Sequence, residues 1–92
     1  MSDWKYTLHV RHIIKNQELS SQESSKRMAK SLQRFCVKHP ILEPAFDLII
    51  TEFTELSTLD LDQTEVTQFF DQALDDLYDL CDFYRIWIPF VK

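Results

Sequence analysis

The sequence predicts a mainly helical domain of three packed helices with extended segments at both ends. Three stretches repeat apolar residues at the spacing of an amphipathic helix, and each has a start or stop signal at its boundary. Glycine is absent, which disfavours the tight turns of a hairpin-rich β fold. With 92 residues, 45% of them apolar and 13% aromatic, we expect one domain over residues 1–92 with its own core.

The first predicted element is a strand over Trp4–Val10. Apolar and polar residues alternate there, and a strand places alternate residues on one face, whereas a helix would scatter them. The alternation stops at Ile13 and Ile14, where we expect a turn or a short helical piece.

The first long helix is predicted to begin at Ser20 or Ser21 and to end before Pro40. Ser20 and Glu23 have the spacing of a capping box. Proline lacks an N–H donor and disfavours helical backbone in the residue before it. The apolar face of this helix carries Met28, Leu32, Phe35 and Cys36. Its outer side is basic and carries Lys26, Arg27, Lys30, Arg34 and Lys38.

The second helix is predicted to begin at Pro44, a residue that suits the first turn of a helix. We expect it to be the most buried of the three helices, because apolar residues cover more than half of its circumference. These residues are Ala45, Phe46, Ile49, Ile50, Phe53 and Leu56. A short linker, Ser57–Asp60, follows.

The third helix has the clearest start. Asp62 is the predicted N-cap and Glu65 lies three residues later, while Leu61 and Val66 have the spacing of a hydrophobic staple. The predicted buried face carries Val66, Phe69, Phe70, Ala73, Leu74, Leu77, Leu80, Cys81 and Tyr84. The other side carries an aspartate stripe, which consists of Asp71, Asp75, Asp79 and Asp82.

Beyond Tyr84 the pattern becomes that of an extended segment, Arg85–Val91. Ile86 and Ile88 alternate with Trp87, and a proline follows them. This segment either pairs with the first strand as a two-stranded ribbon, which makes the fold α+β, or packs as a separate arm. Ile86 and Ile88 are expected in the core, and the place of Trp87 stays open.

The composition disfavours several functions. Without glycine there is no phosphate-cradling loop or nucleotide-binding fingerprint. We expect no membrane span and no signal peptide, and we place the protein in the reducing cytoplasm, where Cys36 and Cys81 would be inert core residues. His9, His12 and His39 lack metal-ligand spacing. We therefore predict no enzyme activity, no cofactor and no metal.

Charge is unevenly divided along the chain. Residues 1–46 carry a net +4 and residues 47–92 a net −9, which together give −5. Carboxylates four residues apart on a helix repel each other by a few tenths of a kcal/mol, and no Lys or Arg lies between Glu52 and Tyr84. The aspartate stripe is either a solvated face or a surface that steers a basic protein partner onto the chain. Arg85, Trp87 and Phe90 would then supply an aromatic anchor.

Further interpretations concern the basic side of the first long helix. Its lysines and arginines are either a solvated face or an internal complement to the aspartates. Alternatively, they could bind the phosphates of a nucleic acid in a regulatory module, or they could meet the aspartate stripe of a second copy in a homo-oligomer. The hypothesis that we favour is a non-catalytic interaction or inhibitor module, with nucleic acid as the alternative.

Both ends of the chain resemble small proteins encoded by phages and prophages. The resemblance rests on the opening WKYTLHV and the charged helix after it, and on the closing LYDLCDFYRIWIPF. In that ending, the residues that match the pattern are Tyr78, Asp79, Asp82, Arg85, Ile86, Trp87 and Ile88. That family carries no established activity, so the resemblance implies a mobile-element origin and favours action by binding, and it transfers no catalytic residue.

Overall fold

The computed structural model describes residues 4–14, 16 and 18–89. Three long helices make up most of the chain. In order, the elements are β1 (Tyr6–Thr7), α1 (Arg11–Ile14), α2 (Ser21–Lys38), the 3-10 helix η1 (Pro40–Leu42), α3 (Glu43–Leu56), α4 (Gln63–Phe83) and β2 (Ile86–Trp87). The predicted class is confirmed: three long helices, with a short sheet formed by the two terminal segments.

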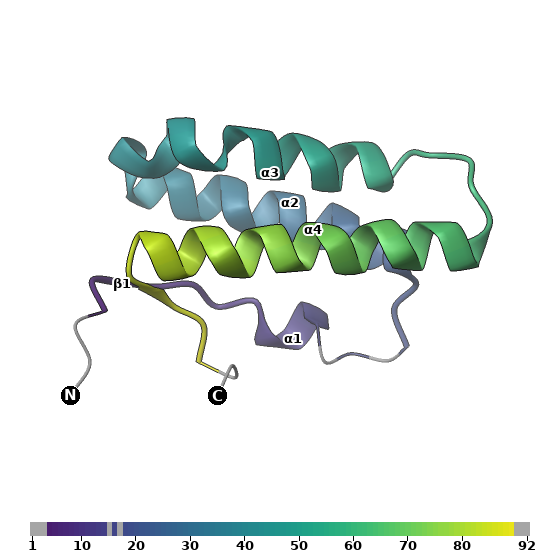
Figure 1. Ribbon diagram of the computed structural model, residues 1–92, viewed down its shortest axis with the longest axis horizontal. Coiled ribbons are helices and arrows are strands. Elements are labelled where there is room, and N and C mark those ends of the chain that lie inside the picture. The colour runs from purple at the N-terminus through teal and green to yellow at the C-terminus, as the bar shows by residue number, and fades with distance from the viewer. Residues whose placement is uncertain (1–3, 15, 17, 90–92) are drawn as a thin grey trace.

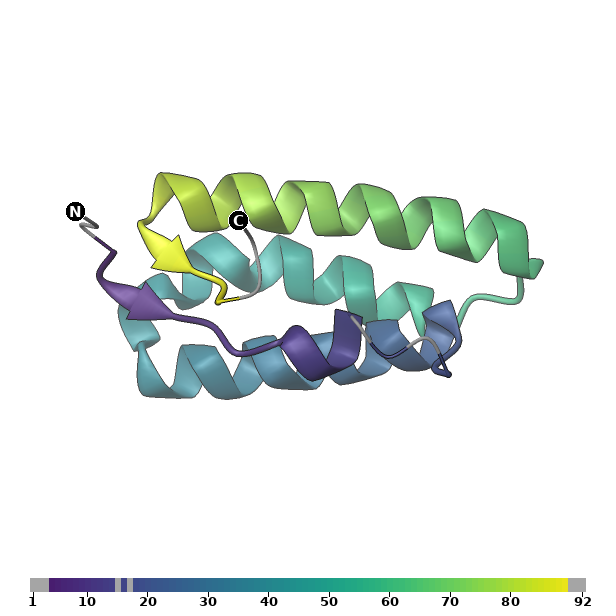
Figure 2. The same ribbon diagram turned by 90° about the horizontal axis from the view of Figure 1, so that it is seen from below.

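The three long helices run antiparallel to their neighbours in the chain and enclose one hydrophobic core (Figure 1). In Figure 1, α4 lies in front, α3 above it and α2 behind. The terminal segments, with β1, α1 and β2, cover the side between α2 and α4, as Figure 2 shows from below. The molecule therefore has separate α2 and α4 sides, and the terminal segments border both.

The terminal segments pair as a parallel two-stranded sheet, with Tyr6 opposite Ile86 and Thr7 opposite Trp87. The N–H of Lys5 donates to the Arg85 carbonyl over 2.8 Å, and the N–H of Leu8 donates to the Trp87 carbonyl over 2.9 Å. The parallel direction follows from the path of the chain, which reverses on entering α2, between α2 and α3, between α3 and α4, and again on leaving α4. After these four reversals β2 runs in the same direction as β1 (Figure 2).

The N-terminal strand is shorter than the predicted range, Trp4–Val10. The pairing is limited to two residues in each segment, Tyr6–Thr7 and Ile86–Trp87. Ile86 and Ile88 are buried as expected, whereas Trp87 is 41% exposed.

Side-chain caps mark the starts of two helices, as predicted. Ser20 Oγ accepts a hydrogen bond from the Glu23 N–H over 3.1 Å, and Asp62 Oδ1 accepts one from the Glu65 N–H over 2.9 Å. Each cap satisfies a donor that the helix itself leaves free. The predicted start of α3 at Pro44 is one residue late, because η1 leads directly into Glu43.

The prediction that the second helix is the most buried is wrong. α3 buries four of its residues, whereas α2 buries eight, including Ser24, Ser25 and Ser31. The reason is tertiary: α2 contacts α1, η1, α3 and α4, so even its small polar residues are covered. By contrast, the apolar residue Leu48 of α3 is 68% exposed.

Both cysteines are free and buried, as predicted. Burial raises the pKa of the Cys81 thiol to about 12. Burial, and secondarily the Glu43 carboxylate, also raise the pKa of the Cys36 thiol. Since the thiolate is the reactive form, neither cysteine is set up as a nucleophile.

Candidate functional site

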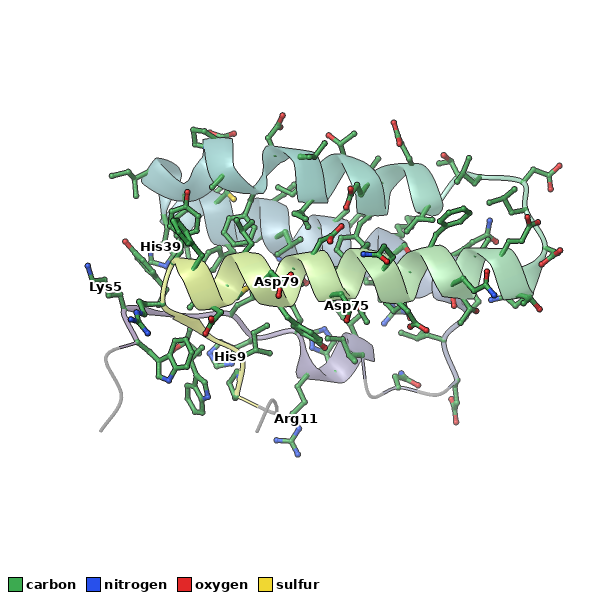
Figure 3. All side chains as sticks on the ribbon, viewed as in Figure 1. Lys5, His9, Arg11, His39, Asp75 and Asp79 are labelled. Carbon is green, nitrogen blue, oxygen red and sulfur yellow. The ribbon has the colours of Figure 1, made fainter. Side chains whose placement is uncertain are left out.

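The aspartate stripe lies on the solvent side of α4, where all four of its side chains are exposed. Figure 3 shows Asp75 and Asp79 on the α4 surface that faces the viewer. Among the residues that the structure describes, no lysine or arginine forms an ion pair with this stripe. Within the described part of the chain, the repulsion among the four carboxylates of the stripe is therefore reduced by solvent and not by a paired cation.

The C-terminal end of the stripe meets the aromatic residues of the terminal segments. Asp82 and Trp87 line one hollow of about 300 Å³ together with Trp4, which is also 41% exposed. The sequence singled out Asp82 and Trp87, and the structure brings them together. Arg85 is exposed at the turn between α4 and β2. Phe90, the third predicted anchor residue, lies outside the described residues.

A second acidic surface lies between α3 and α4, and we call it the α3/α4 groove. It consists of two hollows of about 230 and 320 Å³ that share Asp76. The first is lined by Glu52, Glu55, Leu56, Leu59, Phe69, Gln72, Ala73 and Asp76. The second is lined by Ala45, Leu48, Ile49, Asp76, Asp79, Leu80 and Phe83. Of the aspartate stripe, only Asp79 lines this groove.

The α3/α4 groove collects four of the eight large apolar side chains that are exposed in the described chain: Leu48, Leu59, Phe69 and Phe83. Phe69 was predicted to be buried, yet 52% of its surface is exposed. Phe69 lines the first hollow beside Glu52, Glu55 and Leu56 of α3. The hollow between the two helices leaves about half of the Phe69 side chain uncovered.

The ionisable residues of the groove are all acidic. Glu52 Oε1 is shielded from solvent and has no hydrogen-bond partner within the described part of the chain. Burial, then the Asp76 carboxylate and then the Glu55 carboxylate, raise the pKa of Glu52. A carboxylate in this position lacks the cation or donor that would stabilise its charge.

The basic stripe of α2 is exposed, as predicted: Lys26, Arg27, Lys30, Arg34 and Lys38 all face solvent. Arg27 Nε pairs with Glu23 Oε2 over 3.1 Å. Arg34 and Lys38 line a hollow with His9, His12 and His39, while the other three cations of the stripe do not. The spacing of the three histidines along the sequence did not predict that they would line one hollow.

No group of three or more His, Cys, Asp or Glu residues in the described part of the chain is arranged to hold a metal ion. Over the same residues, no helix combines the length and the apolar composition needed to cross a membrane.

Comparison of the chain with protein-family models, with curated proteins and with solved structures found no match. The function must therefore be argued from the surfaces of the chain itself.

Sequence reasoning missed the α3/α4 groove, although one signal was present. Phe69 and Phe83 lie 14 residues apart at the edge of the apolar face of α4, with Asp76 midway between them. Such edge positions are covered or exposed according to the neighbouring helix, which the pattern of a single helix does not specify.

Proposed function

We propose that this chain is a non-catalytic protein-interaction module, which binds a basic amphipathic helix of a partner in the α3/α4 groove. The observation that carries the proposal is the combination of exposed apolar side chains at both ends of the groove with an entirely acidic set of ionisable residues. An exposed apolar groove with a polar rim is typical of an interaction surface.

The charge of the groove favours a cationic partner. Glu52, Glu55, Asp76 and Asp79 line it, and the chain has no Lys or Arg between Glu52 and Tyr84. A lysine or arginine of the partner in the first hollow would offset the mutual repulsion of the Glu52, Glu55 and Asp76 carboxylates. The other aspartates of the stripe would steer the partner toward the groove, and this effect is screened beyond a Debye length of about 8 Å at physiological salt.

The spacing of the anchors limits the form of the partner. Phe69 and Phe83 are 14 residues apart on α4, which is about 21 Å along the helix axis. A partner helix that lies along the groove would place two large apolar side chains about 14 residues apart, with basic residues between them. A shorter helix reaches only one of the two hollows.

The test uses a synthetic helical peptide with two leucine or phenylalanine anchors about 14 residues apart and lysines between them. Binding is measured by calorimetry at physiological salt. Glu55→Lys with Asp76→Lys should weaken binding by about a hundredfold or more, since two attractions become repulsions next to the bound helix. The matched control is Asp71→Lys with Asp75→Lys, which makes the same change in net charge outside the groove and should weaken binding only several-fold.

Two further variants test the anchors. Phe69→Ser and Phe83→Ser should each weaken binding by about 2 kcal/mol, the size expected for a central apolar anchor. Equal losses in the groove variant and in its control, or full binding by a scrambled peptide of the same composition, would show that the chain attracts cations without a groove site.

The setting of this function is also part of the proposal. Two buried free cysteines fit a protein that acts in the reducing cytoplasm. A phage or mobile-element origin, which the resemblance at both ends of the chain implies, agrees with a protein that inhibits or redirects a partner by binding it.

A further inference from the structure

A hollow of about 220 Å³ lies on the α2 side of the molecule, next to the terminal segment. Its nitrogen-bearing side chains are His9, His12, Arg34, Lys38 and His39. None of the acidic residues that the structure describes lines it, or lines the adjoining shallow hollow formed by His9, Arg11, His12 and Asn16. In a chain with 15 Asp and Glu residues, this is a strong local separation of charge.

Three parts of the fold place these side chains. Ser31, Arg34, Phe35 and Lys38 follow one another on one stripe of α2, at spacings of three, one and three residues. His9 lies between Leu8 and Val10, which are buried, so its side chain is on the opposite, exposed side of the segment. Figure 3 shows His39 at the end of the bundle near β1 and His9 on the terminal segment.

The His39 ring is held in place by aromatic neighbours. Its centroid lies 4.7 Å from that of Tyr6 and 4.8 Å from that of Phe35. Tyr6 is itself held by the pairing of β1 with β2. The hollow therefore depends on tertiary contacts between the two chain termini and α2.

None of the five nitrogen-bearing side chains has an ion pair or a side-chain hydrogen bond with any residue that the structure describes. Arg27, about two turns before Arg34 on the same helix, is by contrast paired with Glu23. Arg34 and Lys38 supply two permanent positive charges and several N–H donors, and the three imidazoles supply further donors. These groups converge on one small space, and within the described part of the chain no side chain pairs with them.

We infer that this hollow is a binding site for a phosphomonoester, a terminal phosphate group with close to two negative charges. Such a group has three oxygens that accept hydrogen bonds. Its two negative charges are balanced by the two positive charges of Arg34 and Lys38. A volume of 220 Å³ equals about seven water molecules at ~30 Å³ each, which leaves room for a phosphate and the atoms next to it. The C-terminal end of α2 carries a partial negative charge, and Lys38 and His39 offset it.

The site differs from a groove for a nucleic-acid strand. Lys26 and Lys30 continue the basic stripe of α2 but do not line the hollow. The cations that converge are those near the C-terminal end of α2, where the histidines join them. A single compact set of donors matches one terminal phosphate better than a series of backbone phosphates.

The experiment follows the side-chain signals of histidine and arginine by NMR while the full chain is titrated with inorganic phosphate or glycerol phosphate at constant ionic strength. We expect saturable shifts at His9, His12, His39 and Arg34. Arg34→Gln with Lys38→Gln should weaken binding about tenfold or more, because two charge-assisted contacts are lost. The matched control, Lys26→Gln with Lys30→Gln, removes the same charge from the same helix and should stay within about threefold.

A second arm separates the sources of the phosphate. An oligothymidylate is titrated with and without a 5′-terminal phosphate. Binding that requires the terminal phosphate, or binding of the small phosphates alone, supports the site. Shifts that never saturate, equal losses in the two double variants, or oligonucleotide binding that ignores the terminal phosphate would overturn it. This arm does not use the α3/α4 groove, so its result is independent of the proposed function.

Discussion

Arg85 is the described residue with a left-handed backbone, at φ 59°. It directly follows Tyr84, the C-cap of α4, in a position that most often carries glycine. This conformation turns the chain from α4 into β2 and lets the Arg85 carbonyl accept hydrogen bonds from the N–H groups of Lys5 and Tyr6. The pairing of the two termini thus depends on a strained residue in a chain that contains no glycine.

The strain can be measured by comparing Arg85→Gly with Arg85→Ala, since both variants remove the same side chain. A residue with a Cβ loses roughly 1–2 kcal/mol in the left-handed region. Glycine avoids this loss but gives up about 0.5–1 kcal/mol in unfolded-state entropy. The glycine variant should therefore be more stable than the alanine variant by about 0.5–1 kcal/mol. For 92 residues, this corresponds to a difference in Tm of about 3–5 °C.

The assay is thermal and urea denaturation followed by circular dichroism. The matched control makes the same pair of substitutions at Gln68, an exposed position inside α4. There the order should reverse, with alanine more stable by about 1 kcal/mol. An Arg85→Ala variant as stable as Arg85→Gly, with the control behaving normally, would show that the turn at Arg85 stores no strain.

Three further predictions concern the core and its titratable groups. Phe53→Ala should lower the free energy of unfolding by about 3–5 kcal/mol, because Phe53 is fully buried. Phe83→Ala should change it by about 0.5 kcal/mol or less, because Phe83 is 76% exposed. Equal losses of the two variants in urea denaturation would contradict the described packing. The raised pKa of Glu52 means that the folded state holds this proton more tightly than the unfolded state does, so its contribution to stability is present at low pH and is lost as the pH rises through the folded pKa. Glu52→Gln should therefore stabilise the protein more at about pH 7 than at about pH 4, and a gain that does not depend on pH would refute the cause. Cys81, whose pKa is raised to about 12, should react with iodoacetamide only as fast as the protein opens, whereas a Gln68→Cys thiol should react at the rate of a free thiol; rapid labelling of Cys81 in the native protein would contradict its burial.

Local signals predicted the helices well. The Ser20 and Asp62 caps are made by backbone and side-chain atoms within four residues, so no tertiary contact is needed to form them. The apolar residues of the helices were also largely placed correctly, because a helix of fixed period brings them to one face. The prediction for Phe69 was wrong because this residue lies at the edge of that face, where exposure depends on how closely the neighbouring helix packs.

The candidate sites were predicted only in part. The aspartate stripe is a property of one helix, so the sequence placed it correctly on the surface. The sharing of Asp76 between two hollows requires α3 beside α4, and the meeting of Arg34 with His39 and His9 requires the terminal segment beside α2. No spacing along the chain encodes these distances.

The sequence by itself determined the three helices, two of their caps, the extended ends and the separation of positive from negative charge. Each of these depends on contacts within a few residues or on composition. The tertiary structure decided the parallel direction of the sheet, the exposure of Phe69, the dominance of α2 in the core and the two hollows that we propose as binding sites. These features depend on how the helices and the terminal segments pack against one another, and this packing brings together residues that are far apart in the sequence.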